Sequence, residues 1–183
     1  MSKKETTRLP GNTRLSPNFK LSEFLKSQTA VRRGIDNYPD DDEHIVNMRA
    51  LCVNVLERVR AEFFMRYPGK GLFLSSGYRN EELNTAIKGS DRSQHCKGQA
   101  ADIDGDYNGI PNEEIFNFIR DNCDDPVTGF DQLIWEFGDD EAPAWVHVSQ
   151  RNDGKNRGRV TIASGKKTGK GADYKHIKEG RKF

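Results

Sequence analysis

Ser93-Gln94-His95-Cys96-Lys97-Gly98-Gln99-Ala100-Ala101-Asp102 is the stretch from which the rest of the chain can be interpreted. It places an imidazole and a carboxylate seven residues apart. His95 leaves a polar loop, and Asp102 lies on a strand predicted over residues 100–104. Gly98 permits a tight turn between them. Because histidine nitrogen and aspartate oxygen both bind zinc, the stretch predicts two ligands of one metal site.

A catalytic zinc site needs a third protein ligand and an open position for water. His147 is the best candidate, because it lies on a predicted strand over residues 144–149, between two valines. If those valines face the core, the histidine faces the opposite side of the sheet. The other two histidines fit less well, since His44 is at a helix start and His176 is in a basic tail.

A metal-activated water also needs a general base, which is usually a carboxylate that does not bind the metal. Glu136 is suitably placed on a predicted strand over residues 133–137, which should pair with the strand of His147. Arg79 follows a short predicted strand at a glycine turn, and its guanidinium could bind a substrate carboxylate. Cys96 is expected to be structural, because adjacent residues rarely share a metal.

The remaining pattern predicts an α+β fold in which a small central antiparallel sheet packs with helices. A long helix should begin after Pro39, because apolar residues recur there every three or four positions. This stripe comprises Ile45, Met48, Cys52, Val55, Val59 and Phe63. Asn112 is expected to cap a second helix, and residues 158–162 are predicted to add a last strand.

Charge divides the chain into three parts. Residues 1–15 carry a net charge of +3, residues 16–150 carry −10 and residues 151–183 carry +8. This asymmetry predicts a flexible basic lead over residues 1–15 and a folded domain over 16–162. It also predicts a Gly- and Lys-rich tail over 163–183, to which no structure is assigned.

Cysteine usage and the N-terminus bear on location. Cys52, Cys96 and Cys123 are odd in number and widely spaced, which argues against a disulfide framework. No apolar run follows the N-terminus, so no secretory signal is expected, and no stretch is apolar enough for a membrane span. These features predict synthesis in the cytoplasm.

Several motifs, in this order, resemble the zinc D-alanyl-D-alanine carboxypeptidase and L-alanyl-D-glutamate endopeptidase family. The family includes vancomycin-resistance dipeptidases and phage endolysins, and its fold and metal site are shared with the hedgehog signalling domain. The resemblance covers residues 16–150. The motifs are Ser75-Ser76-Gly77-Tyr78-Arg79, Leu83-Asn84, Ser93-Gln94-His95-x-x-Gly98-x-Ala100-x-Asp102 and Trp145-Val146-His147-Val148-Ser149.

The resemblance implies a zinc peptidase that cuts peptidoglycan stem peptides or cross-links. The absence of a secretory signal predicts that it acts on the wall after release as a phage lysis enzyme, or as a virion component. The resemblance implies that His95, Asp102 and His147 bind Zn2+. Glu136 would be the base, and Arg79 would contact the substrate or the developing oxyanion. Ser93 would support the loop of His95.

The sequence departs from the family at the general base. Many relatives carry it three residues before the last histidine, where this chain has Ala144, and others carry a histidine where this chain has Trp145. The base must then come from the preceding strand, as in the hedgehog-like branch. The acidic turn over residues 139–141 offers competitors to Glu136.

Other features leave alternatives open. Residues 104–109 match the first half of a calcium loop, but the twelfth position is Ile115 rather than glutamate, which favours a simple turn. The basic tail could hold an anionic cell-wall polymer. It lacks the interleaved aromatic residues that favour nucleic-acid binding, so nucleic acid is not expected. The protein is expected to be a monomer.

Two further functions compete with the peptidase. The first is a catalytically silent zinc-containing module that binds the cell wall, which predicts bound zinc without turnover. The second is a virion structural or adhesion domain that acts through the basic tail. It predicts that removing residues 151–183 abolishes function, whereas His95→Ala does not.

Overall fold

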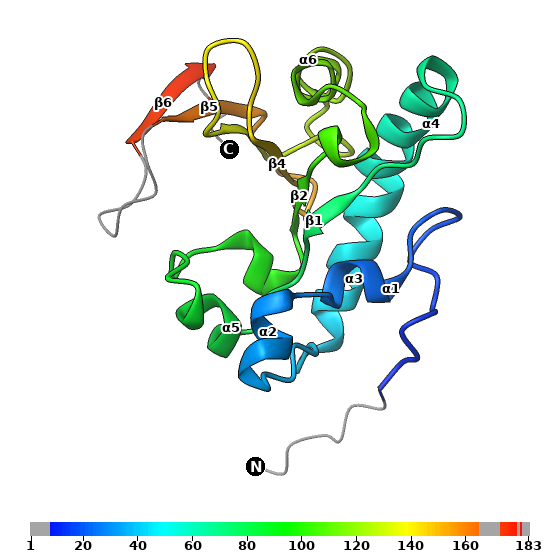
Figure 1. Ribbon diagram of the computed structural model, residues 1–183, viewed down its shortest axis with the longest axis vertical. Coiled ribbons are helices and arrows are strands. Elements are labelled where there is room, and N and C mark those ends of the chain that lie inside the picture. Colours follow the sequence, from blue (N-terminus) through cyan, green and yellow to red (C-terminus); the bar gives the residue numbers. More distant parts are fainter. Residues whose placement is uncertain (1–7, 165–172, 179, 181–183) are drawn as a thin grey trace.

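The computed structural model describes residues 8–164, 173–178 and 180, and in this part six strands form one mixed sheet (Figure 1). The strands are β1 (Leu74–Ser76), β2 (Ala100–Ile103), β3 (Gln132–Glu136), β4 (Trp145–Ser149), β5 (Arg159–Ser164) and β6 (Asp173–Lys178). The helices are α1 (Leu21–Leu25), α2 (Gln28–Arg33), α3 (Asp42–Leu51), α4 (Glu57–Arg66), α5 (Glu81–Ala86) and α6 (Asn112–Asn122). Shorter turns are the π-helical η1 (Cys52–Leu56) and the 3₁₀ turns η2 (Gln94–Lys97) and η3 (Asp106–Asn108).

The strands lie in the order β1-β2-β4-β3-β5-β6, which confirms the α+β prediction. Neighbouring strands are antiparallel except β3 and β5, which run parallel. The sheet is therefore mixed rather than wholly antiparallel. After β4 the chain crosses to the far side of β3 and forms β5 there. β5 runs in the direction opposite to β4, as β3 does, so β5 and β3 are parallel.

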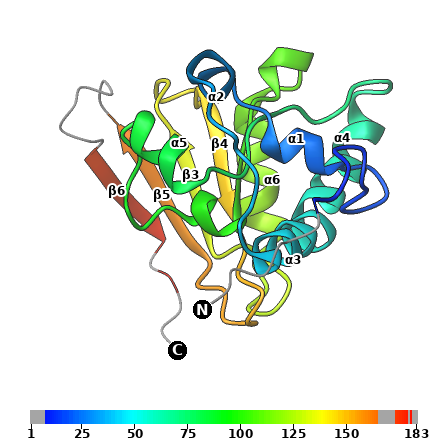
Figure 2. The same cartoon turned by 90° about the horizontal axis from the view of Figure 1, so that it is seen from below.

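The predicted long helix is continuous through α3, η1 and α4. Asp41 begins it by accepting a hydrogen bond from the Glu43 amide at 2.9 Å. Every residue of the predicted apolar stripe is buried, and the stripe packs with residues of α6 and the sheet in one core. Figure 2 shows α3, α4 and α6 on one side of the sheet, whereas α5 lies over the other side.

Asn112 does not cap α6 as predicted. Its side chain accepts from the Gly105 amide at 2.7 Å and donates to Asp106 at 3.0 Å and Ala144 at 3.2 Å. Asn112 is fully buried, so it ties the turn after β2 to the segment before β4. Because this site offers several backbone partners, the amide forms those bonds in place of a cap.

The C-terminal region extends the sheet beyond the predicted last strand. β5 continues to Ser164, and β6, to which no structure was assigned, pairs with it in antiparallel register. Residues 165–172, in the predicted tail, lie outside the described residues. No helix in the described part of the chain is long and apolar enough to cross a membrane.

Three cross-strand rows cover the sheet face opposite α3, α4 and α6. The ligand row comprises Asp102, His147, Ile134, Thr161 and His176. The base row comprises Trp145, Glu136, Ala163 and Tyr174. The third row comprises Ala100, Ser149, Gln132 and Arg159. Because paired residues project from the same face of a sheet, these rows bring polar side chains together over one surface.

Candidate metal centre

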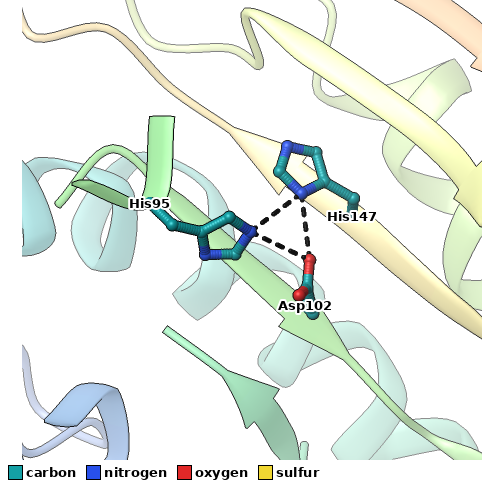
Figure 3. A group of neighbouring side chains, drawn as sticks. All are labelled: His95, Asp102 and His147. Carbon is teal, nitrogen blue, oxygen red and sulfur yellow. Dashed lines mark hydrogen bonds and ion pairs between the residues drawn. The ribbon is translucent and has the colours of Figure 1, made fainter. Parts of the chain in front are cut away.

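The structure brings His95, Asp102 and His147 together from three elements (Figure 3). Asp102 on β2 pairs in register with His147 on β4, so both project from the same face. His95 reaches them from η2, which is followed by Gly98 in the left-handed conformation with φ of 67°. An added Cβ at Gly98 would meet the His44 carbonyl oxygen at 2.2 Å, so the turn needs glycine.

The three donor atoms form a nearly equilateral triangle. His147 Nδ1 lies 2.9 Å from Asp102 Oδ1, and His95 Nε2 lies 3.2 Å from each of those atoms. A tetrahedral zinc site with ligand distances of about 2.0–2.1 Å has edges of about 3.3 Å. All three side chains are buried. The triangle therefore fits one face of a zinc tetrahedron, with the fourth position left for water or substrate.

His95 is oriented by the backbone. Its Nδ1 lies 2.6 Å from the Gly77 carbonyl oxygen, which fixes Nδ1 as the donor and leaves the Nε2 lone pair facing the triangle. Burial lowers the pKa of His95 below its usual value, which favours the neutral imidazole. A neutral imidazole is the form that binds metal.

Asp102 is held by a cation as well as by the histidines. Arg79 donates from Nη2 to Asp102 Oδ2 at 2.6 Å and from Nε to Ser76 Oγ at 3.0 Å. Burial alone would raise the pKa of Asp102, but its interactions with His95 and His147, including a hydrogen bond from each, hold it well below its usual range. The carboxylate is thus ionised, with Oδ2 bound to Arg79 and Oδ1 facing the triangle.

The triangle lies in a pocket of about 850 Å³. The floor includes Glu136, Ile134 and Thr161 from the sheet, and one wall is the segment over residues 87–94. Glu136 is diagonal to His147 in the sheet, since it is two residues beyond the register partner Ile134. Diagonal neighbours lie about 7–8 Å apart, within reach of a glutamate side chain and a water molecule.

The acidic turn that competed with Glu136 does not line this pocket. Asp139 instead accepts hydrogen bonds from the backbone amides of Glu141 and Ala142, both at 2.9 Å, which lower its pKa. Only Glu136 among these carboxylates combines a place in the pocket with proximity to the triangle.

Ser93 and Cys96 belong to the turn that carries His95. The Ser93 carbonyl oxygen accepts from the Cys96 amide at 3.2 Å, and Ser93 also lines the pocket. Cys96 is a half-buried free thiol that does not join the triangle. Among the His, Cys, Asp and Glu side chains of the described residues, His95, Asp102 and His147 form the single group of three with metal-ligand spacing.

Sequence reasoning missed the contribution of β6. Tyr174 and His176 both line the pocket, although the sequence placed His176 in an unstructured tail. Thr161 on β5 lies 3.2 Å from His176 Nδ1 through its Oγ1 atom. The available signal was the alternation in Asp173-Tyr174-Lys175-His176-Ile177-Lys178, which fits a strand with an aromatic face.

Comparison with known proteins identifies a family. The family model described as Peptidase M15 matches residues 17–149. Among curated proteins, none matches the chain.

Proposed function

The chain belongs to the peptidase M15 family, and we propose that it hydrolyses a peptide bond in the stem peptides or cross-links of bacterial peptidoglycan. Members of this family are zinc metallopeptidases that act on peptidoglycan peptides. The observation that supports the proposal most directly is the triangle of two imidazoles and one carboxylate beside Glu136 in one pocket.

His95, Asp102 and His147 would hold the zinc. Zinc, when bound, supplies a Lewis acid that activates water and polarises the peptide carbonyl. Glu136 accepts the proton that the attacking water loses and returns it to the leaving amine. Arg79 anchors Asp102 through its Oδ2 atom, so its primary role is to fix a ligand. The same guanidinium lines the pocket and can also face the substrate.

The test is digestion of defined muropeptides by the zinc-loaded protein, read by mass spectrometry. The mass of each product identifies the bond and separates carboxypeptidase from endopeptidase activity. Glu136→Gln keeps the side-chain shape and should lower kcat by at least about a hundredfold, in line with the contribution of a general base. Glu141→Gln, in the acidic turn, should leave activity unchanged.

The result also separates the peptidase from a silent module. The protein would be a binding module if it bound one equivalent of zinc but released no product from either monomeric or cross-linked muropeptides. Activity equal in Glu136→Gln and wild type would remove Glu136 from the mechanism.

We further propose that the enzyme meets the wall from the cytoplasmic side after the membrane is opened, as a phage lysis enzyme does. Support comes from Cys52, Cys96 and Cys123, which are all free thiols, so the described fold does not depend on an oxidising compartment. Expression in a bacterium should cause lysis only when a membrane pore is co-expressed. Lysis by the enzyme alone would contradict this route.

A further inference from the structure

β6 lies beyond the residues that match the family, yet it lines the same pocket as the triangle. The family match ends at residue 149, whereas β6 spans Asp173–Lys178. Tyr174 and His176 face the pocket together with His147. Figure 1 shows β6 at the sheet edge far from β1, with β5 between it and the strands that carry the site. The pocket therefore has a wall that the family match does not include.

The base row brings Tyr174 towards Glu136. Ala163 on β5 pairs with Glu136 on one side and with Tyr174 on the other. Adjacent strands lie about 4.8 Å apart, so the Cα atoms of Glu136 and Tyr174 are separated by about 10 Å. Because only a methyl group stands between them, the phenol can lean across Ala163 towards the carboxylate.

Electrostatics and exposure agree with this placement. Burial raises the pKa of Tyr174, and the negative charges of Glu136 and Asp102 raise it further. The hydroxyl thus stays protonated and able to donate near neutral pH. Tyr174 nevertheless keeps about 54% of its surface exposed, so a bound ligand can reach it.

We propose that β6 forms a substrate-binding wall and that the Tyr174 hydroxyl donates a hydrogen bond to the peptide that binds in the pocket beside Glu136. The partner is a main-chain carbonyl of the stem peptide, because a phenol in the same row as the Glu136 carboxylate favours an acceptor that carries no full negative charge. This inference rests on the proposed peptidase function and names a residue that touches the substrate.

His176 shapes the same wall through its contact with Thr161. Thr161 is fully buried, and its Oγ1 lies 3.2 Å from His176 Nδ1. This contact holds the exposed imidazole at the β6 end of the ligand row, on the same wall as Tyr174.

The experiment compares Tyr174→Phe with Tyr107→Phe. Both variants lose one phenol hydroxyl from an exposed tyrosine, but Tyr107 stacks on Phe73 and does not line the pocket. Tyr174→Phe should raise KM for a cleaved muropeptide about three- to tenfold, the effect of one neutral hydrogen bond. Zinc content, Tm and the Tyr107→Phe kinetics should match wild type.

A binding measurement separates this inference from the proposed function. In the Glu136→Gln background, calorimetric titration with the same muropeptide should give a Kd that Tyr174→Phe weakens by the same factor. If the wild type cleaves the muropeptide and Tyr174→Phe has the same KM and Kd as its parent protein, the wall proposal is wrong while the proposed function stands. A lowered Tm or zinc content in Tyr174→Phe would also overturn it, in favour of a structural role. If wild type cleaves no muropeptide, the proposed function fails, and the Kd comparison still tests Tyr174.

Discussion

At the scale of single residues, Arg79 makes a contact that the sequence did not suggest. The sequence suggested a substrate contact, whereas the structure pairs its guanidinium with Asp102 Oδ2 at 2.6 Å. Its side chain is only 17% exposed. Residues that hydrogen-bond to a metal ligand commonly fix its orientation, and Arg79 is placed to do this for Asp102.

We therefore predict that Arg79→Ala weakens zinc affinity about 10- to 100-fold, because Asp102 loses the partner that fixes its orientation. Competition with a chromophoric chelator measures the affinity. Arg92→Ala, which removes another pocket arginine, should retain wild-type zinc affinity. If Arg79→Ala loses activity but keeps wild-type zinc affinity, Arg79 instead acts by contacting the substrate.

Gly98 makes a second prediction at this scale. Gly98→Ala should lower Tm more than Gly34→Ala, although both glycines have nearly equal positive φ values of 67° and 66°. An added Cβ at Gly34 meets nothing within 4 Å, whereas at Gly98 it meets the His44 carbonyl oxygen. Gly34→Ala should cost about 1 kcal/mol, which corresponds to about 2–4 °C in a chain of this size.

Zinc content provides the second measurement for Gly98. Because η2 carries His95, displacement of the residue that follows it should also weaken zinc binding in Gly98→Ala, whereas Gly34→Ala should bind zinc normally. Equal Tm values and equal zinc binding in the two variants would show that the turn accommodates the methyl group.

At the scale of elements, an ion pair between Asp131 and Arg157 joins the segments that precede β3 and β5. Asp131 is fully buried and accepts from Arg157 Nε at 2.9 Å and from Gln94 at 3.0 Å. Burial would raise the pKa of Asp131, but the hydrogen bonds and charge of Arg157 lower it below the usual value. Gln94 belongs to η2, so the pair also connects the sheet to the turn of His95.

A depressed folded-state pKa stabilises the protein above the unfolded-state pKa of about 3.9. As pH falls through that value the unfolded chain takes up the proton first, and stability declines until the folded pKa is passed. We predict that Asp131→Asn lowers the urea midpoint at pH 7 but flattens its fall below about pH 4. Measurements with chelator present remove the metal contribution, and parallel curves for both proteins would contradict the prediction.

Sequence patterns predicted elements better than their pairing. The stripe from Ile45 to Phe63 identified the long helix, because burial of one helix face imposes a period that the sequence displays. The three triangle residues were named correctly as neighbours, since Asp102 and His147 lie on strands whose faces alternate. Sequence could not reveal that β3 runs parallel to β5, because strand order depends on contacts between distant segments.

β6 shows why the remaining wall could not be predicted. Edge strands are short and rich in lysine, which protects their free backbone groups from aggregation but also resembles a solvated tail. Lys175 and Lys178 made β6 resemble part of a solvated basic tail. Recognising Tyr174 as a pocket residue required the pairing of Ala163 with both of its neighbours.

At the scale of the whole molecule, zinc should act as a cross-link between η2, β2 and β4. Free zinc at a thousand times its Kd adds about 4 kcal/mol to the free energy of unfolding. For a chain of this size the expected rise in Tm is about 8–16 °C. Calorimetry with zinc and with chelator measures it, and Asp102→Asn should show less than half of the difference. An equal shift in Asp102→Asn would locate the stabilising ion elsewhere.

The cross-strand rows carry a consequence for how this protein tolerates insertions and deletions. Alternation along β4 means that one added residue before His147 would rotate its imidazole into the apolar interior and turn a valine outward. Two added residues would restore the side but move the imidazole by about 7 Å. Activity should therefore tolerate almost no change in chain length within these strands.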